Sequence, residues 1–93
     1  MDSNKKAIVS VIGMDKVGII AQTSQLLAEC GANILDLSQT VMQDYFTMIM
    51  LVDLQNATVP FSEISQRLAR KGDEIGMVMR IQREDIFNAM HRL

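Results

Sequence analysis

The spacing of hydrophobic and polar residues changes period several times along this chain, and each change marks an element. Residues 7–12 are β-branched and apolar at odd and even positions, which predicts a strand covered at least in part on both faces. Residues 19–30 carry apolar side chains at helical spacing, so we expect a helix there, ended by Gly31. The predicted buried stripe of this helix is Ile19, Thr23, Leu26, Leu27 and Cys30.

A period of two returns in residues 33–43 and 45–53, which meet at a short turn, Gln43-Asp44. Strands joined so closely are expected to form an antiparallel hairpin. The first strand has a half-buried pattern, with Leu35, Leu37 and Val41 on one parity and Asp36, Ser38 and Thr40 on the other. The second is expected to direct Phe46, Met48, Met50 and Val52 to one face.

A second helix, a fourth strand and a tail complete the predicted order. Pro60 suits the first turn of a helix, where its missing N–H costs nothing, and Gly72 is expected to end that helix. The predicted buried face holds Phe61, Ile64 and Leu68. Residues 77–82 have the pattern of a strand. The tail, 83–93, has apolar residues at helical spacing, which predicts a short amphipathic helix docked on an apolar surface: Ile86, Phe87, Met90 and Leu93.

The predicted order, β-α-β-β-α-β plus a C-terminal helix, is that of an α+β, ferredoxin-like sandwich. Its usual form is a four-stranded antiparallel sheet with both helices on one face. The other face then needs a cover, because Ile49 and Leu51 would point there if Met48 and Met50 face the helices. A partner sheet, a partner chain or the C-terminal helix would each supply that cover.

Size and charge limit the classes of partner. The 93 residues make one domain, residues 1–93, with a core small enough that dimerisation would help its stability. A net charge of −2 and a pI near 5.2 argue against nucleic acid. No apolar stretch is long enough to span a bilayer, and no secretory signal follows residues 1–6. We therefore expect a cytoplasmic protein without a membrane partner.

The residues that usually perform catalysis are scarce. The single Cys30 excludes an internal disulfide and a cysteine-rich zinc site, and its place on the apolar stripe predicts a buried thiol. His91 is the only histidine, and no paired acids converge with another reactive group. The expectation is a protein that is not an enzyme, with no catalytic residue, metal site or cofactor.

The loop 13–19 is the best candidate for contact with a small ligand. Gly13 and Gly18 bracket an acid, Asp15, and a base, Lys16, between a predicted strand and a predicted helix. A helix N-terminus offers unpaired N–H groups that favour negative charge. The loop alone favours a structural role, however, in which Gly13 turns the chain, Gly18 lets helix and strand pack closely, and Asp15 is the N-cap or a dipole partner of the helix. It lacks the Lys-Ser/Thr pair of a P-loop and the third glycine of a dinucleotide site.

Three stretches together resemble the ACT domain, a small-molecule regulatory module of amino-acid metabolism. They are residues 11–20, with Gly-x-Asp-x-x-Gly-Ile, residues 26–34, which end in Asn-Ile, and residues 46–48, Phe-Thr-Met. The chain is similar to the ACT modules of formyltetrahydrofolate deformylase and of the glycine-cleavage repressor. Its tail, 81–93, resembles that of short, free-standing bacterial and archaeal ACT-domain proteins of uncharacterised function.

The resemblance implies binding without catalysis. ACT domains pair, often side by side, and bind an amino acid at the interface between domains. Transferred to this sequence, the ligand-binding positions are Met14, Asp15, Lys16, Val17, Gly18, Ile19, Asn33 and Ile34. Asp15 would take a ligand ammonium, Asn33 an ammonium or carboxylate, and N–H groups near Gly18 the carboxylate.

Two functions follow as hypotheses. The first is a non-enzymatic regulatory or sensor module that binds a small metabolite, an amino acid by preference, as a homodimer. Because the 93 residues hold no catalytic domain, its effect must pass to a separate protein. The alternative is a protein-interaction module that binds no ligand and acts through its dimer surface or its C-terminal helix.

Overall fold

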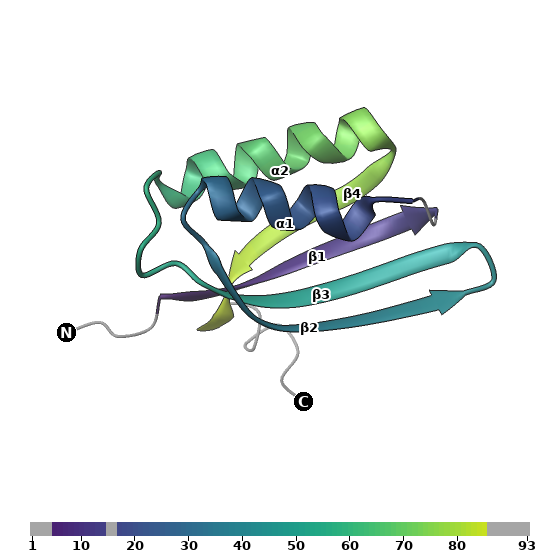
Figure 1. Cartoon of the computed structure of the whole chain (residues 1–93), viewed down its shortest axis with the longest axis horizontal. Helices are drawn as coiled ribbons and strands as arrows, with labels where there is room; N and C mark the ends of the chain where they lie inside the picture. Colours follow the sequence, from purple (N-terminus) through teal and green to yellow (C-terminus); the bar gives the residue numbers. More distant parts are fainter. Residues whose placement is uncertain (1–4, 15–16, 86–93) are drawn as a thin grey trace.

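Two helices lie on one face of a four-stranded sheet in the computed structural model, which describes residues 5–14 and 17–85 (Figure 1). The strands are β1 (Lys6–Met14), β2 (Asn33–Met42), β3 (Tyr45–Asp53) and β4 (Met77–Arg83), and the helices are α1 (Ile19–Glu29) and α2 (Phe61–Ile75). The sheet order is β2-β3-β1-β4, and all neighbours are antiparallel. The predicted βαββαβ ferredoxin-like fold is confirmed. The helix predicted within the tail falls on residues 86–93, outside the described residues.

The core lies between the sheet and the helices, where the sequence pattern placed it. The predicted inward residues of β3 are all buried, and so is the whole predicted stripe of α1. In the sheet, Val9 stands opposite both Met50 and Ile81, so three strands contribute to one buried row. Thr23 is a buried polar residue of this core, and its hydroxyl donates to the Ile19 carbonyl at 2.8 Å. That bond offsets the cost of burying the hydroxyl.

The prediction that α2 ends at Gly72 is wrong. The helix continues to Ile75 and ends at Gly76, which has the left-handed backbone (φ 75°) common at helix ends. Gly72 is instead buried against β4, where an added Cβ would lie 2.4 Å from the Met77 carbonyl oxygen. The glycine at 72 therefore allows a close approach between helix and strand.

Two strand predictions also need correction. β1 runs on through Gly13 and Met14, which pair with β3, so the loop begins later than the glycine suggested. In β2 the register shifts between Ile34 and Asp36, and the extra residue, Leu35, is 45% exposed rather than buried. Val41 is also exposed, because β2 is an edge strand.

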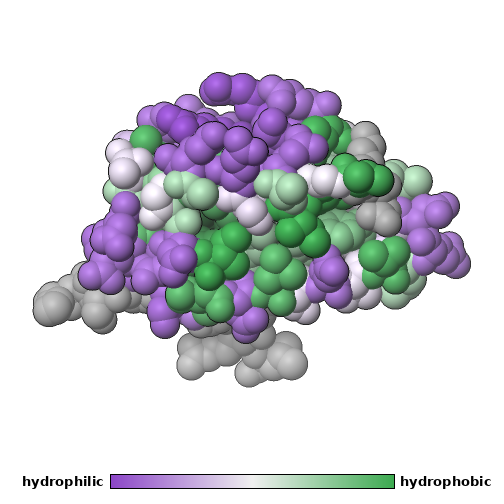
Figure 2. Space-filling model, in the orientation of Figure 1, coloured by the Kyte–Doolittle hydropathy of each residue, from purple (hydrophilic) through white to green (hydrophobic). Residues whose placement is uncertain are grey.

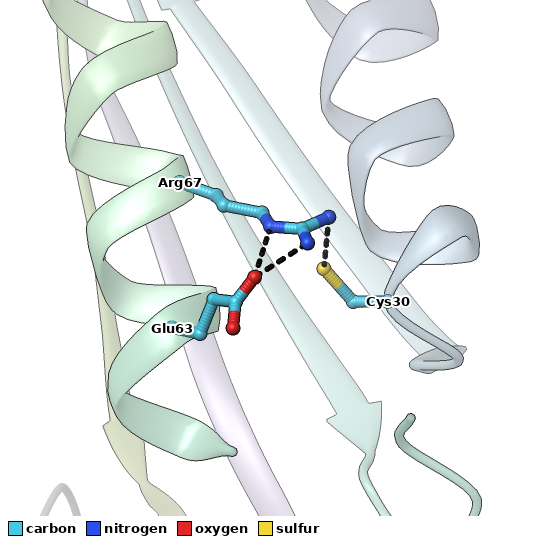
Figure 3. Close-up of polar contacts among 3 residues, drawn as sticks. All are labelled: Cys30, Glu63 and Arg67. Atoms are coloured by element: carbon cyan, nitrogen blue, oxygen red, sulfur yellow. Dashed lines mark hydrogen bonds and ion pairs between the residues drawn. The ribbon is translucent and has the colours of Figure 1, made fainter. Parts of the chain in front are cut away.

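A polar cluster joins the end of α1 to α2 (Figure 3). Arg67 Nε donates to Glu63 Oε2 at 3.1 Å, and Arg67 Nη1 lies 3.8 Å from Cys30 Sγ. The hydrogen bond to Glu63 is the main cause that raises the pKa of Arg67 above its ordinary value. Cys30 is fully buried, as predicted, and serves here as a packing residue between the helices.

Candidate functional site

A hollow of about 300 Å³ lies between the start of α1 and strands β2 and β3. The antiparallel register builds it, because Gly13 stands opposite Phe46, and Phe46 stands opposite Val41. The end of β1, the start of α1 and the β2–β3 hairpin therefore meet at one end of the molecule. The lining residues are Gly18, Ile19, Ile20, Ala21, Gln39, Val41 and Phe46.

The start of α1 gives the hollow a set of N–H donors. Gly18 is the N-cap residue, so the interpretation in which Asp15 holds that position is wrong. Gly18 has a left-handed backbone (φ 88°) and offers no capping side chain, and the first turn carries no acidic residue. The N–H groups of a first helical turn lack intrahelical acceptors and favour a negatively charged group. This end of the hollow thus suits a carboxylate.

Gln39 supplies the polar side chain on the opposite wall. It stands opposite Met48, on the side of the sheet that faces the helices, and it is exposed. Its carboxamide is able both to donate and to accept hydrogen bonds. Sequence reasoning missed this residue. The available signal was parity, because Gln39 is a polar residue between Leu37 and Val41, which share its alternation.

The remaining wall is apolar and comes from both layers. Ile19 and Phe46 are 3% and 4% exposed, so each presents only a small part of its surface to the hollow. Val41 and Ile20 are 53% and 37% exposed and form the outer rim. Figure 2 shows hydrophobic surface along the lower front of the molecule, below the hydrophilic surface of the upper helix α2. The hollow joins a small polar end to an apolar wall.

The structure brings together only some of the residues predicted for the site. Gly18 and Ile19 line the hollow. Met14 and Val17, although they belong to the same loop region, are not among its lining residues and are exposed. Asp15 and Lys16 lie outside the described residues.

Asn33 and Ile34 lie far from the hollow within one chain. Asn33 stands opposite Asp53 at the far end of the sheet, because β2 begins where α1 ends. It is eight residues from Val41, or roughly 26 Å along an extended strand.

The second hollow and the groupings of charged side chains offer fewer groups that could bind a ligand. A hollow of about 460 Å³ runs between α2 and β4, with Ser65, Asp73 and Arg80 among its lining residues. In residues 5–14 and 17–85, no three His, Cys, Asp or Glu side chains are grouped so that they could hold a metal ion. Over the same residues, no helix is both long and apolar enough to cross a membrane.

Comparison with known proteins covers nearly the whole chain. A family model described as "ACT domain" matches residues 5–82. A UPF0237 protein of Clostridium acetobutylicum is 56% identical over 88 residues, which are 95% of this chain and 99% of the relative. The match in both lengths makes this relative a small protein of the same extent.

Solved structures agree with the family model. The ACT domain protein from Streptococcus pneumoniae has a TM-score of 0.78 and 40% identity, over 92% of this chain and 97% of that chain. A putative glycine cleavage system transcriptional repressor (TM-score 0.70, 20% identity) is matched over 83% of this chain and 44% of its own. A formyltetrahydrofolate deformylase from Pseudomonas putida (0.73, 13%) is matched over 83% and 28%. At these lower identities, the repressor and the deformylase structures are similar to this chain in fold, as the sequence resemblance implied.

Proposed function

This chain belongs to the ACT domain family, and we propose from that premise that it is a non-enzymatic regulatory module for a small metabolite of the amino-acid class. The observation that carries the proposal is the hollow, which joins the first turn of α1 to Gln39 across an apolar wall. Its volume, about 300 Å³, lies at the small end of the range for ligand pockets. An amino acid has the matching parts, a carboxylate, an ammonium and a side chain.

Each group of such a ligand can be assigned to particular residues. The carboxylate lies at the N–H groups after Gly18, where the helix dipole favours it. The Gln39 carboxamide bonds either polar group, and an aliphatic side chain contacts Ile19 and Phe46. We assign the ammonium to Asp15, the role that the sequence resemblance implies.

We propose that the ligand is bound at the interface of a homodimer that pairs along β2. This edge strand exposes apolar Leu35, Val41 and Met42, and residues 37–42 carry no charge. The other edge strand, β4, carries Arg80 near its centre, and symmetric pairing there would oppose like charges. Charge thus favours β2 over β4 for self-pairing.

Pairing along β2 brings the partner's Ile34 to the hollow, although Ile34 of the same chain lies far from it. With a two-fold axis that pairs Ser38 with the partner's Ser38 and passes over the bulge at Leu35, the partner's Ile34 comes opposite Val41, on the face of the hollow. The partner's Asn33 comes opposite Met42 on the other face, so only its main chain borders the site. The site is then built from two chains, and its response passes to a separate protein.

The second candidate is a ligand-free interaction module. It is supported by apolar side chains on the sheet face away from the helices, where Ile12 and Val78 are 49% and 56% exposed. A protein surface of that kind is suited to contact with another protein.

A thermal-shift screen of amino acids decides between the two. A ligand that binds only the folded state stabilises by about 2.7 kcal/mol at 100 times its dissociation constant. Gln39→Ala should remove the shift, and the matched control Gln55→Ala, at an exposed position in the turn after β3, should keep it. No shift with any amino acid favours the interaction module.

A further inference from the structure

The outer edge of β4 borders a groove beside α2. β4 is the last strand of the sheet, so among residues 5–14 and 17–85 no strand pairs with its outer side. The main-chain N–H and C=O groups of such an edge are available for pairing with another chain. The groove, here called the β4 groove, is the hollow of about 460 Å³ that β4 lines as far as Gln82. Helix α2, which packs beside β4 (Figure 1), contributes three further lining residues: Ser65, Ala69 and Asp73.

The spacing of these three α2 residues matches the spacing of a strand. Only Gly76 separates α2 from β4, so the two elements run in opposite directions, with Asp73 toward the start of β4 and Ser65 toward its end. Residues four apart on a helix are about 6 Å apart along its axis, and alternate residues of a strand are about 6.6 Å apart. A strand added beside β4 would therefore direct one side chain to each of the three positions.

Two charged residues make the β4 groove selective. Arg80 lies near the centre of β4 and is exposed on the sheet face away from the helices, whereas Asp73 is exposed on α2. Within the part of the chain that the structure describes, neither has an ion-pair partner. A second copy paired symmetrically here brings two arginines together, but an acidic residue of a different chain would be attracted. Charge therefore favours a partner other than this chain.

We propose that the β4 groove binds an extended segment of a partner protein, which joins the sheet as a fifth strand. Arg80 specifies an acidic residue opposite it, and Asp73 specifies a basic residue three positions away, on the other face of the added strand. The two residues between them are apolar, one in the space beside Ala69 and one opposite Val78, which is 56% exposed. The groove shares no lining residue with the hollow at the start of α1, so binding here requires no metabolite.

Selection from a displayed library of random ten-residue peptides tests the proposal, with the full-length protein as the target and no metabolite added. Enriched peptides should carry an acidic and a basic residue three positions apart, separated by two apolar residues. One enriched peptide is then synthesised and titrated by fluorescence anisotropy. N-methylation of its main chain should weaken binding by about tenfold at alternate residues only, since every second N–H of an added strand faces β4.

Variants of the protein show where the peptide binds. Arg80→Glu should weaken binding by about tenfold, and a peptide with lysine in place of its acidic residue should regain the loss. Ala69→Trp should fill the groove and abolish binding. The matched control Gln66→Trp, at an exposed position of α2 outside the groove, should bind normally. Circular dichroism checks that each variant is folded.

Several results would overturn the proposal. If no peptide is enriched, or if binding survives both Arg80→Glu and Ala69→Trp, the β4 groove is not a peptide site. Equal sensitivity to N-methylation at every position would exclude strand addition. A lower molecular mass of Ala69→Trp in light scattering would show that a second copy occupies the groove. All of these measurements are made without a metabolite, so their failure is distinct from failure of the hollow at α1.

Discussion

At the scale of single residues, the glycines of this chain differ in what makes them necessary. Gly18 has a left-handed backbone, but the space around it is open, since the nearest atom to an added Cβ is Gln22 Nε2 at 3.6 Å. At Gly72 the backbone is ordinary for a helix but the space is filled, since the Met77 carbonyl oxygen would lie 2.4 Å from an added Cβ. The cost of substitution is conformational at the first and steric at the second.

The conformational cost predicts the order of variants at Gly18. Gly18→Val should lower the free energy of unfolding by about 1–2 kcal/mol, because a β-branched residue disfavours φ near 88°. Gly18→Asn should lose less, since asparagine tolerates that region. Urea denaturation of the two variants measures the difference, and equal losses would contradict a backbone origin.

The steric cost predicts a larger effect at Gly72. Gly72→Ala should destabilise by about 1–3 kcal/mol through overpacking against β4, despite the better helix propensity of alanine. The control is Arg70→Ala, an exposed position on the same helix, which should change stability by less than about 0.5 kcal/mol. A stabilised Gly72→Ala variant would show that α2 does not approach β4 as described.

At the scale of elements, the edge strand β2 sets the proposed assembly. Ser38→Lys places a charge beside its own copy near the two-fold axis, so the dimer should dissociate while the exposed position leaves the fold intact. Light scattering coupled to size exclusion gives the mass, and circular dichroism checks the fold. The control Ser62→Lys lies on an exposed part of α2 and should remain dimeric. A dimeric Ser38→Lys variant would exclude pairing along β2.

Helices and strands were predictable where the spacing of apolar residues along the sequence decides the structure. The alternation of Phe46, Met48, Met50 and Val52 and the stripe of α1 are read from neighbours in sequence, and both are confirmed. Gly72 was misread because its contact, the Met77 carbonyl, is made by tertiary packing, and a glycine at a helix end has the same local pattern. Leu35 was misread because a bulge shifts parity without a residue type that marks it.

At the scale of the whole molecule, the site was the least predictable part. The loop and Asn33 both suit a polar ligand, but only the register of the sheet shows that they lie at opposite ends. Gln39 was overlooked because its importance depends on the position of α1 above it. A site of this kind is built from residues that are distant in sequence, and no local pattern shows that the fold brings them together.

The two-chain site predicts that two defective variants restore each other. Gln39→Ala and Ile34→Ala should each weaken the ligand-dependent thermal shift in its own homodimer. In a mixed dimer, one site combines an intact Gln39 with the partner's Ile34, so calorimetric titration of the mixture should recover up to about half of the mixed dimers' sites. If Ile34→Ala alone binds normally, the partner's Ile34 does not belong to the site.

The open edge of β2 also has a consequence for how such a sensor would respond. If the ligand contacts both copies, binding and association are linked, and each must strengthen the other by the same factor. The apparent affinity for the metabolite then rises with the concentration of the protein, and the metabolite lowers the concentration at which half of the chains are paired. The signal passed to a regulated partner would then depend on two concentrations together, that of the metabolite and that of the sensor itself.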